Sequence, residues 1–310
     1  MIPPFLYFNP TLVSTKSILG RNSMIDTTAT RYKFKSFAKD VHVLDGWQEF
    51  LQACGLNSFE DFIAFTGEVV DQNSRSIVQR IKLGDPHKIF YLKYHRNYVR
   101  RKARAFFRPE PIIYTELENM MHYARAGFDA LDPVAYGWQK DKKGGNSFLL
   151  ITDLKDYRPL QTYLDNDLIM SSAEKRRTIS SALSSGLAAI HDSGLAHRDF
   201  FTWHVFMKPL LNSYKLQPID LERSIKKGKM LWSSFVIKRR QIDDLASLHL
   251  TVPWPLVSFS ERMRFFHNYR KKRGMSGSGH KLLKAILKRA KDRGGRRKFK
   301  TYGVAGKLRT

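Results

Sequence analysis

Apolar residues in the first half of the chain follow the pattern of β-strands. Residues 63–70, 76–83 and 88–94 are rich in β-branched and aromatic side chains, and polar or proline-containing turn sequences separate them. Segments of this kind predict three strands in an antiparallel meander. Residues 133–138 and 147–152 have the same character and predict two further strands in the same half of the chain.

Apolar residues at helical spacing follow the meander and then dominate the second half. One stripe ends before a glycine at position 127, and its members are Ile113, Leu117, Met120, Met121 and Ala124. Residues 179–190 carry one face of a long helix, and residues 241–250 and 260–270 predict two more helices. A sheet-rich half followed by a helix-rich half indicates the α+β fold class.

Changes in composition divide the chain into four segments. Residues 1–40 mix proline, serine, threonine and basic residues without a clear period, and we expect them to be poorly ordered. Residues 41–153 form the sheet-rich part, and residues 154–270 form the helix-rich part. The polar stretch at residues 153–158 is the expected link between these two lobes. Residues 271–310 form a basic C-terminal tail.

Two acidic residues in the second half are placed as a phosphoryl-transfer centre requires. Asp199 lies in the segment after the long helix, and Asp220 follows a predicted hairpin made by residues 205–208 and 215–219. Phosphoryl transfer needs one carboxylate near the attacking hydroxyl and another that holds Mg²⁺ against the phosphates. Asp199 is therefore the candidate catalytic base, and Asp220 is the candidate metal ligand, because a buried carboxylate is costly without a cation.

Three further residues complete a kinase-like set. Lys93 ends the third predicted strand, where alternation can point its ammonium group into the cleft between the lobes to hold phosphates. Glu116 on the next helix is the candidate partner of this lysine, with Glu118 as the alternative. His204 follows Asp199 by five residues and either ligates a metal weakly as a neutral imidazole or positions Asp199 or a phosphate by hydrogen bonding.

Four sequence segments together resemble the lipopolysaccharide kinases of Gram-negative bacteria, the core heptose kinase and Kdo kinase family. The resemblance extends from about Gly67 to Arg270, and the segments are His197-Arg198-Asp199-Phe200-Phe201-Thr202-Trp203-His204-Val205-Phe206, Ile219-Asp220-Leu221-Glu222-Arg223, Asp244-Leu245-Ala246-Ser247-Leu248 and Glu261-Arg262-Met263-Arg264-Phe265-Phe266-His267-Asn268-Tyr269. The resemblance implies a bilobal protein-kinase-like fold with a small antiparallel-sheet N-lobe and a mainly helical C-lobe. It also implies ATP, Mg²⁺ and phosphorylation of a heptose or Kdo hydroxyl in the lipopolysaccharide inner core.

The resemblance also assigns roles by position. It makes Asp199 the catalytic base, Asp220 the metal ligand, His204 the replacement for a metal-binding asparagine, Lys93 the phosphate-binding lysine and Glu116 its partner. The chain departs from the wider kinase pattern in the loop at residues 70–76, which contains no glycine. A backbone with side chains at every position approaches phosphates less closely than a glycine-rich one.

Composition is consistent with a globular protein in a reducing compartment. Hydrophobic residues make up 42% of the 310 residues, enough for a substantial core, and Cys54 is the single cysteine. One cysteine excludes an internal disulfide and a cysteine-based metal cluster. No apolar run approaches the roughly 18 residues of a membrane-spanning helix. We therefore expect a cytoplasmic protein, soluble or peripheral at the inner face of the inner membrane.

Charge is concentrated at the C-terminus. The formal net charge is +26, and residues 270–310 contain sixteen Lys or Arg residues against one acid, Asp292. Such a tail favours a polyanionic partner: lipopolysaccharide or a related glycolipid, an anionic membrane surface or, less favoured, nucleic acid. An apolar stripe within it, made of Leu282, Leu283, Ile286, Leu287 and Ala290, predicts a helix that either lies on a membrane or packs on the core. We favour the membrane or glycolipid alternative.

Two other functions remain open from the sequence. An atypical protein kinase would share the same centre but would bind an extended peptide. A pseudokinase or scaffold would bind polyanions through the tail, and the retention of Lys93, Asp199 and Asp220 argues against it. An aminoglycoside-type phosphotransferase would normally have glycine in place of Arg198 and asparagine in place of His204.

Overall fold

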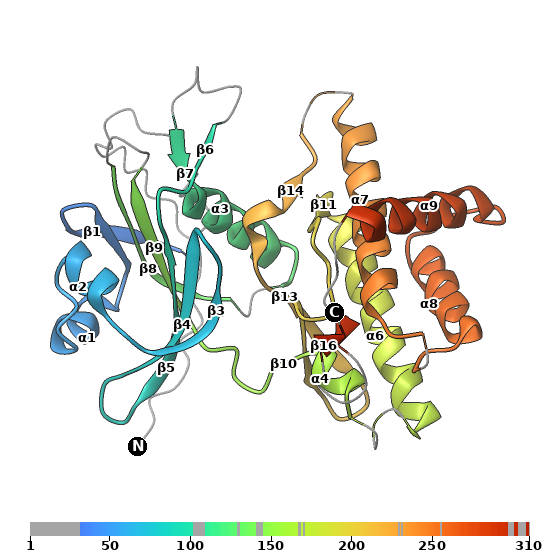
Figure 1. Ribbon diagram of the computed structural model, residues 1–310, viewed down its shortest axis with the longest axis horizontal. Helices are drawn as coiled ribbons and strands as arrows, with labels where there is room; N and C mark the ends of the chain where they lie inside the picture. Colours follow the sequence, from blue (N-terminus) through green and yellow to red (C-terminus); the bar gives the residue numbers. More distant parts are fainter. Residues whose placement is uncertain are drawn as a thin grey trace, which may run out of the picture.

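The strand-like segments of the first half form one antiparallel sheet. Its strands are β1 (Phe34–Ala38), β2 (Val41–Leu44), β3 (Glu68–Gln72), β4 (Ser76–Leu83), β5 (Lys88–His95), β8 (Pro133–Gln139) and β9 (Asn146–Thr152). The seven strands are arranged in the order β1-β2-β8-β9-β5-β4-β3 (Figure 1). Lys93 pairs with Val78 on β4 and with Leu149 on β9, so it lies on an inner strand with neighbours on both sides.

This computed structural model describes most of the chain. The described residues are 32–101, 109–128, 131–140, 145–166, 169, 171–228, 230, 232–254, 256–296, 301–302 and 308–309. Most of the N-terminal segment expected to be poorly ordered, residues 1–31, lies outside them.

Helices cover both faces of the sheet. Helices α1 (Gln48–Ala53) and α2 (Phe59–Ala64) lie on the outer face, and α3 (Ile112–Arg125) lies on the face toward the second lobe (Figure 1). Alternation along β5 sends Leu92 into the core under α1 and α2, whereas the next residue, Lys93, points to the α3 side. The central strand therefore delivers its lysine toward the space between the lobes.

The start of the first predicted strand was wrong. Ile63 and the residue after it belong to α2, and β3 begins at Glu68. Ser58 caps α2 in a reciprocal capping box with Asp61, which satisfies backbone amides at the helix start. Phe62 of this short helix stacks on Phe148 with ring centroids 4.3 Å apart, so packing favours a helix where β-branched and aromatic content suggested a strand.

The poor order expected up to residue 40 was wrong for residues 34–38. They form β1, which pairs antiparallel with β2, and Phe34 packs edge-on against Tyr136 of β8 at 4.9 Å between ring centroids. Strand β1 is short, and its pairing with β2 has a register shift between Ser36 and Ala38. The alternation of apolar and polar residues that identifies a strand was therefore not apparent from the sequence. The sheet-rich lobe therefore begins before residue 41.

The second lobe is mainly helical and contains several short strands (Figure 1). Its helices are α4 (Leu160–Leu164), α6 (Ala173–Asp192), the 3₁₀ helix η2 (Leu221–Arg223), α7 (Ser233–Thr251), α8 (Phe259–Lys272) and α9 (His280–Arg296). Its strands are β10 (Arg158–Pro159), β11 (Leu195–Ala196), β12 (Val205–Pro209), β13 (Tyr214–Pro218) and β14 (Ile225–Lys226). Strand β11 pairs with β14, and two further short pairings in the chain join β6 (Val99–Arg101) to β7 (Pro109–Pro111) and β15 (Thr301–Tyr302) to β16 (Leu308–Arg309).

The predicted helices and hairpin of this lobe are confirmed. Residues 179–190 lie in α6, residues 241–250 lie in α7, and residues 260–270 lie in α8. Strands β12 and β13 pair antiparallel and form the hairpin that precedes Asp220. The two lobes are joined between β9 and β10, and together they form a bilobal kinase-like fold.

The amphipathic helix of the basic tail packs on the second lobe. In α9, Ile286 and Ala290 are buried in the same core as Leu245 and Leu248 of α7, whereas Leu287 is 45% exposed. Of the two alternatives that the sequence left open, the structure shows packing on the core for most of the apolar stripe. Ile286 and Ala290 are therefore not free to enter a membrane, and docking of this helix on a membrane or glycolipid stays a prediction.

Within the described part of the chain, no helix is both long enough and apolar enough to cross a lipid bilayer.

Candidate active site

Lys93 is held between the lobes by three carboxylates. Its Nζ lies 3.0 Å from Oε2 of Glu116 on α3, 2.7 Å from Oδ1 of Asp220 and 3.5 Å from Oε2 of Glu222 on η2. The structure therefore pairs this lysine with Glu116, as predicted. The alternative partner, Glu118, is half exposed and lies 3.8 Å from His122. Sequence reasoning missed Glu222 as a third carboxylate, although it follows Asp220 by only two residues.

Mutual attraction and burial shape the charges in this cluster. Burial disfavours the ammonium group, but Asp220, Glu116 and Glu222 outweigh it and raise the pKa of Lys93 well above its usual value. Burial raises the pKa of Glu116 to about 7, with Asp220 and Glu222 adding to the shift against the opposing effect of Lys93. Burial also disfavours ionised Asp220, yet Lys93 and then His204 hold its pKa well below the usual range. Three acids facing one lysine leave an excess of negative charge.

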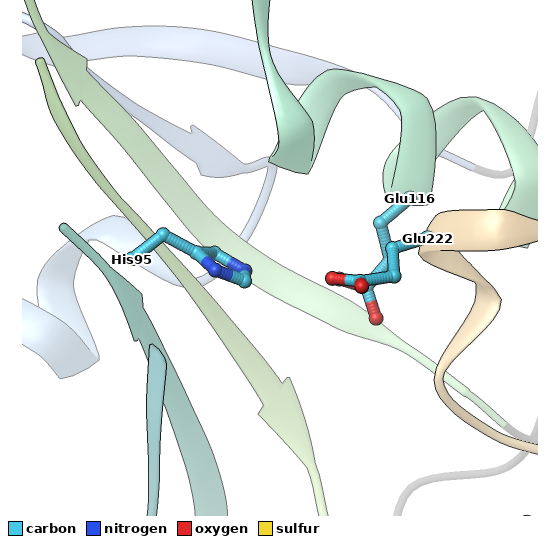
Figure 2. Close-up of side chains that lie close together, drawn as sticks. All are labelled: His95, Glu116 and Glu222. Carbon is cyan, nitrogen blue, oxygen red and sulfur yellow. The ribbon is translucent and has the colours of Figure 1, made fainter. Parts of the chain in front are cut away.

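His95 faces the same acidic cluster from β5. Figure 2 shows its ring pointing toward Glu116 and Glu222, and one ligand atom from each of the three residues lies within 4.8 Å of the others. The ring is fully buried, and neither nitrogen has a hydrogen-bond partner among the described residues. Burial, followed by the charge on Lys93, lowers the pKa of His95 to about 3, so the imidazole is neutral. The carboxylates and the neutral imidazole are thus groups that can hold a cation.

A buried carboxylate on α7 positions the loop that carries Asp199. The backbone N–H groups of His197 and Arg198 donate to Asp244 at 2.8 and 2.5 Å, and Asp244 is fully buried. Arg198 has a φ of 75° and Asp220 has a φ of 57°, a left-handed conformation that residues other than glycine adopt rarely. Such conformations persist where surrounding contacts hold them and are enriched at functional sites.

His197 joins the two loops that carry the candidate acids. Its Nε2 lies 2.8 Å from the carbonyl oxygen of Ile219, which can only accept, so Nε2 carries the proton. Its Nδ1 accepts from the backbone N–H of Asp199 at 3.3 Å. Burial lowers the pKa of His197, in agreement with a neutral ring that donates at one nitrogen and accepts at the other. Asp199 and Asp220 are thereby held at a fixed separation.

His204 also uses its two nitrogens differently. Nδ1 donates to the carbonyl oxygen of Asp199 at 2.9 Å, whereas Nε2 faces Oδ2 of Asp220 at 3.8 Å. In the neutral ring this tautomer leaves the Nε2 lone pair on the side of Asp220. The same side chain is therefore placed both to position the Asp199 loop and to face a metal held by Asp220.

Two arginines hold the carboxylate of Asp199. Arg223 Nη1 lies 2.6 Å from Oδ2, and Arg293 Nη2 lies 3.1 Å from Oδ1. Arg223 ends η2, and Arg293 comes from α9 in the basic tail. Sequence reasoning missed both residues, because a basic residue in a strongly basic chain gives no signal of a specific contact.

The turn between β3 and β4 is closed by side-chain hydrogen bonds in place of glycine. Asn73 Oδ1 accepts from the backbone N–H groups of Arg75 and Ser76 at 2.8 and 3.0 Å. Val69 and Val70, on the strand before it, are each 55% exposed.

A cavity within the helical lobe contains none of these residues. It has a volume of about 170 Å³ and is lined mainly by apolar side chains of α6, α7, α8 and α9, including Leu183, Leu248, Phe265 and Ile286. Without a convergent set of polar groups, this cavity does not supply the chemistry of a transfer reaction. The acidic cluster and the Asp199 loop remain the candidate active site.

The fold and this site define a kinase, a phosphotransferase built on the bilobal protein-kinase plan. The family model described as the lipopolysaccharide kinase (Kdo/WaaP) family matches residues 62–269. The chain belongs to this family. The resemblance inferred from the four sequence segments is therefore confirmed.

Known proteins give one further comparison. The chain is similar to the solved structure described as WaaP in complex with acyl carrier protein, with a TM-score of 0.59 and 20% sequence identity. The similarity covers 81% of this chain and 98% of that chain, and it confirms the fold. No curated protein matches the chain.

Proposed function

We propose that the protein transfers the γ-phosphoryl group of ATP to a sugar hydroxyl, of heptose or Kdo, in the lipopolysaccharide inner core. The observation that carries the proposal is the contact of Lys93 with both Glu116 and Asp220 beside the Asp199 loop, in a chain that belongs to the lipopolysaccharide kinase family. A lysine–glutamate pair, a metal-binding aspartate and a catalytic aspartate are the parts that kinases share.

Lys93 and Glu116 are proposed to receive the nucleotide phosphates. Glu116 is 5% exposed and is fixed on α3, so it keeps the ammonium group of Lys93 in place when the phosphates arrive. In this structure Oδ1 of Asp220 lies 2.7 Å from Nζ of Lys93. Phosphate oxygens would take over this contact, and Asp220 would be released to serve as a ligand.

The residues present fit a divalent cation. The excess of carboxylates over lysine calls for positive charge, and carboxylate oxygens are the donors that Mg²⁺ prefers. Asp220 and His204 are the residues that would hold it, with the Nε2 lone pair of His204 already facing Asp220. When bound, Mg²⁺ neutralises charge that develops on the transferring phosphoryl group.

Asp199 is proposed to be the catalytic base. The acceptor hydroxyl would pass its proton to a carboxylate oxygen of Asp199 while its own oxygen bonds to the γ-phosphorus. The bond between the γ-phosphorus and the β,γ-bridging oxygen breaks, and that oxygen leaves with the electron pair as part of ADP. All five residues, Lys93, Glu116, Asp199, His204 and Asp220, are thus proposed to act in the roles that their positions along the chain predict.

The protein is further proposed to work at the inner face of the inner membrane as a peripheral protein. Support comes from the outer face of α9, where Lys281, Lys284, Lys288 and Lys291 are exposed around Leu287. A cluster of lysines of this kind is attracted to anionic headgroups without any insertion of the helix. A lipid-linked acceptor would be concentrated at the same surface.

The proposal is tested by transfer of labelled γ-phosphate from ATP, with Mg²⁺, to purified lipopolysaccharide from a strain that lacks this gene. We expect label in the glycolipid and a loss of at least about 100-fold with Asp199→Ala, the size of a general-base contribution. Asp165→Ala removes an exposed carboxylate of the same lobe and serves as the matched control.

A generic protein acceptor in the same assay separates the alternatives. Label only in protein would replace the proposal with an atypical protein kinase. No transfer to either acceptor, together with no nucleotide binding, would favour a scaffold that binds polyanions.

A further inference from the structure

The candidate site has two parts of opposite charge. Around Lys93, the three carboxylates exceed the one cation. Around Asp199 the balance is reversed, because Asp199 and the buried Asp243 face more cations than acids. The cations are Arg223, Arg240, Arg289 and Arg293. The first part suits metal ions, and among the described residues the second part contains more arginines than carboxylates.

The arginines cover the proposed base. Each carboxylate oxygen of Asp199 accepts from one guanidinium group, and the side chain of Asp199 is only 8% exposed. An acceptor hydroxyl must approach one of these oxygens to within hydrogen-bond distance before it can transfer a proton. Each oxygen keeps a second lone pair, but because the side chain is only 8% exposed, a hydroxyl reaches Asp199 more easily once one arginine moves.

Arg293 is the more firmly held of the two. Its Nη2 also donates to the carbonyl oxygen of Arg198 at 3.1 Å, and its guanidinium group lies 5.6 Å from the ring centroid of Phe201. Its side chain is 12% exposed. These contacts fix Arg293 to the backbone of the Asp199 loop and to the core beneath it.

Arg223 is placed to move. Its side chain is 38% exposed, and Asp199 is the one carboxylate that its guanidinium group contacts among the described residues. It ends the short η2 helix, three residues after Asp220, and its backbone oxygen accepts from Arg198 at 3.3 Å. The side chain can therefore leave Asp199 while its backbone stays attached to the loop.

We propose that Arg223 and Arg293 form an anion subsite. This subsite binds a carboxylate or phosphate group next to the accepting hydroxyl and so recognises the acceptor. The anion draws the guanidinium group of Arg223 from Asp199 and exposes the base only when the correct acceptor is present. A guanidinium fork matches the planar geometry of a carboxylate or two oxygens of a phosphate. This inference rests on the proposed function and specifies its substrate class as an acidic sugar unit.

The test compares three forms of the acceptor with wild-type protein. They are native lipopolysaccharide, material stripped of phosphate by hydrofluoric acid, and material whose sugar carboxylates are reduced to alcohols. We expect removal of the relevant anion to raise the acceptor KM at least about tenfold, since charge-assisted pairing contributes on this scale. If removal of phosphate raises the KM, the anion is a phosphate. If reduction of the carboxylates raises it, the anion is a carboxylate.

Variants connect that preference to the arginines. Arg223→Gln should remove the discrimination between native and anion-free acceptor, and Arg223→Lys, which keeps charge but not the fork, should retain part of it. Arg125→Gln changes an exposed arginine at the end of α3 and should discriminate like wild type. Equal use of all three acceptors by wild-type protein, or full discrimination by Arg223→Gln, would overturn the subsite.

Binding separates failure of this inference from failure of the proposed function. Each acceptor is titrated into protein loaded with a non-hydrolysable ATP analogue and Mg²⁺. Weaker binding of the anion-free acceptor that depends on Arg223 supports the subsite even if no phosphoryl transfer is detected. Equal binding of all acceptors contradicts the subsite even if transfer occurs.

Discussion

Asp244 organises more of the catalytic loop than any residue that would touch a substrate. It accepts from the backbone of His197 and Arg198, and its Oδ2 also lies 3.1 Å from Nε2 of His191. Burial lowers the pKa of His191, so the ring is neutral and donates from Nε2 while Nδ1 accepts from the hydroxyl of Tyr269 at 2.7 Å. One fully buried carboxylate thus satisfies three donors.

Asp244→Asn should weaken both folding and catalysis. The amide group would place its own N–H donors against a donor of the loop, and an unsatisfied buried group costs about 1–3 kcal/mol. We expect the free energy of unfolding to fall by about that amount and kcat to fall at least about tenfold. Denaturant titration and the transfer assay measure the two effects. Asp165→Asn, which changes an exposed acid, should alter neither, and unchanged kcat in Asp244→Asn would contradict the positioning role.

The sequence identified residues that have a fixed place in the order of kinase elements. Lys93, Glu116, Asp199, His204 and Asp220 could be proposed because each follows a recognisable strand, helix or hairpin. His95, Glu222 and Arg293 could not, because their importance arises from contacts between segments far apart in the chain. A local pattern contains no information about which distant charge it will meet.

At the scale of elements, α9 shows how packing resolves what amphipathicity leaves open. The helix has one apolar stripe, and that stripe serves equally well against a membrane or against protein. The structure divides it: Ile286 is buried in the core where α9 packs on α7, whereas Leu287 is exposed among lysines. Two neighbouring apolar residues therefore have different energetic roles.

Ile286→Ala should destabilise the protein far more than Leu287→Ala. Removing buried methyl and methylene groups costs about 2–5 kcal/mol, whereas a change at an exposed position usually costs less than about 0.5 kcal/mol. The difference is measured by thermal or denaturant unfolding of the two variants. Equal effects would mean that α9 does not pack on the lobe as described.

The α2 segment shows that a short sequence pattern can predict the wrong type of element. Its aromatic and β-branched residues indicated a strand, but the capping box at Ser58 and burial of Phe59 and Phe62 favour a helix. The predicted α6, α7 and α8 were confirmed because their longer apolar stripes repeat the helical period several times. Short elements depend more on the surface they cover than on their own sequence.

At the scale of the whole molecule, positive charge has two roles: some basic residues form ion pairs within the protein, and others are exposed to solvent. Arg289 and Arg293 of α9 face inward, where they contact Asp243 and Asp199. The lysines of the same helix face outward. A net charge of +26 therefore does not describe a uniform field, because one set is engaged within the protein and the other is available to a partner.

The protein should bind vesicles that contain anionic lipid and not vesicles of zwitterionic lipid alone. Each lysine near the surface contributes about 1 kcal/mol, and the attraction is screened as ionic strength rises from about 0.05 to about 0.5 M. Vesicle sedimentation measures the bound fraction at each salt concentration.

A charge-reversal variant identifies the surface responsible. Lys284→Glu, Lys288→Glu and Lys291→Glu together should abolish vesicle binding. The matched control reverses the same number of exposed lysines on the sheet-rich lobe, which are Lys33, Lys39 and Lys82. Binding that survives in the α9 variant and is lost in the control would place the membrane-facing surface on the other lobe.

Arg293 has a consequence for how this kinase is divided into modules. The family match ends at residue 269, whereas Arg293 lies 24 positions further along the chain and contacts Asp199. A fragment cut at the end of the match would retain Lys93 and Asp220 and still lose one of the two cations at the base. The boundary that a shared motif draws and the boundary of a self-sufficient catalytic unit therefore fall in different places.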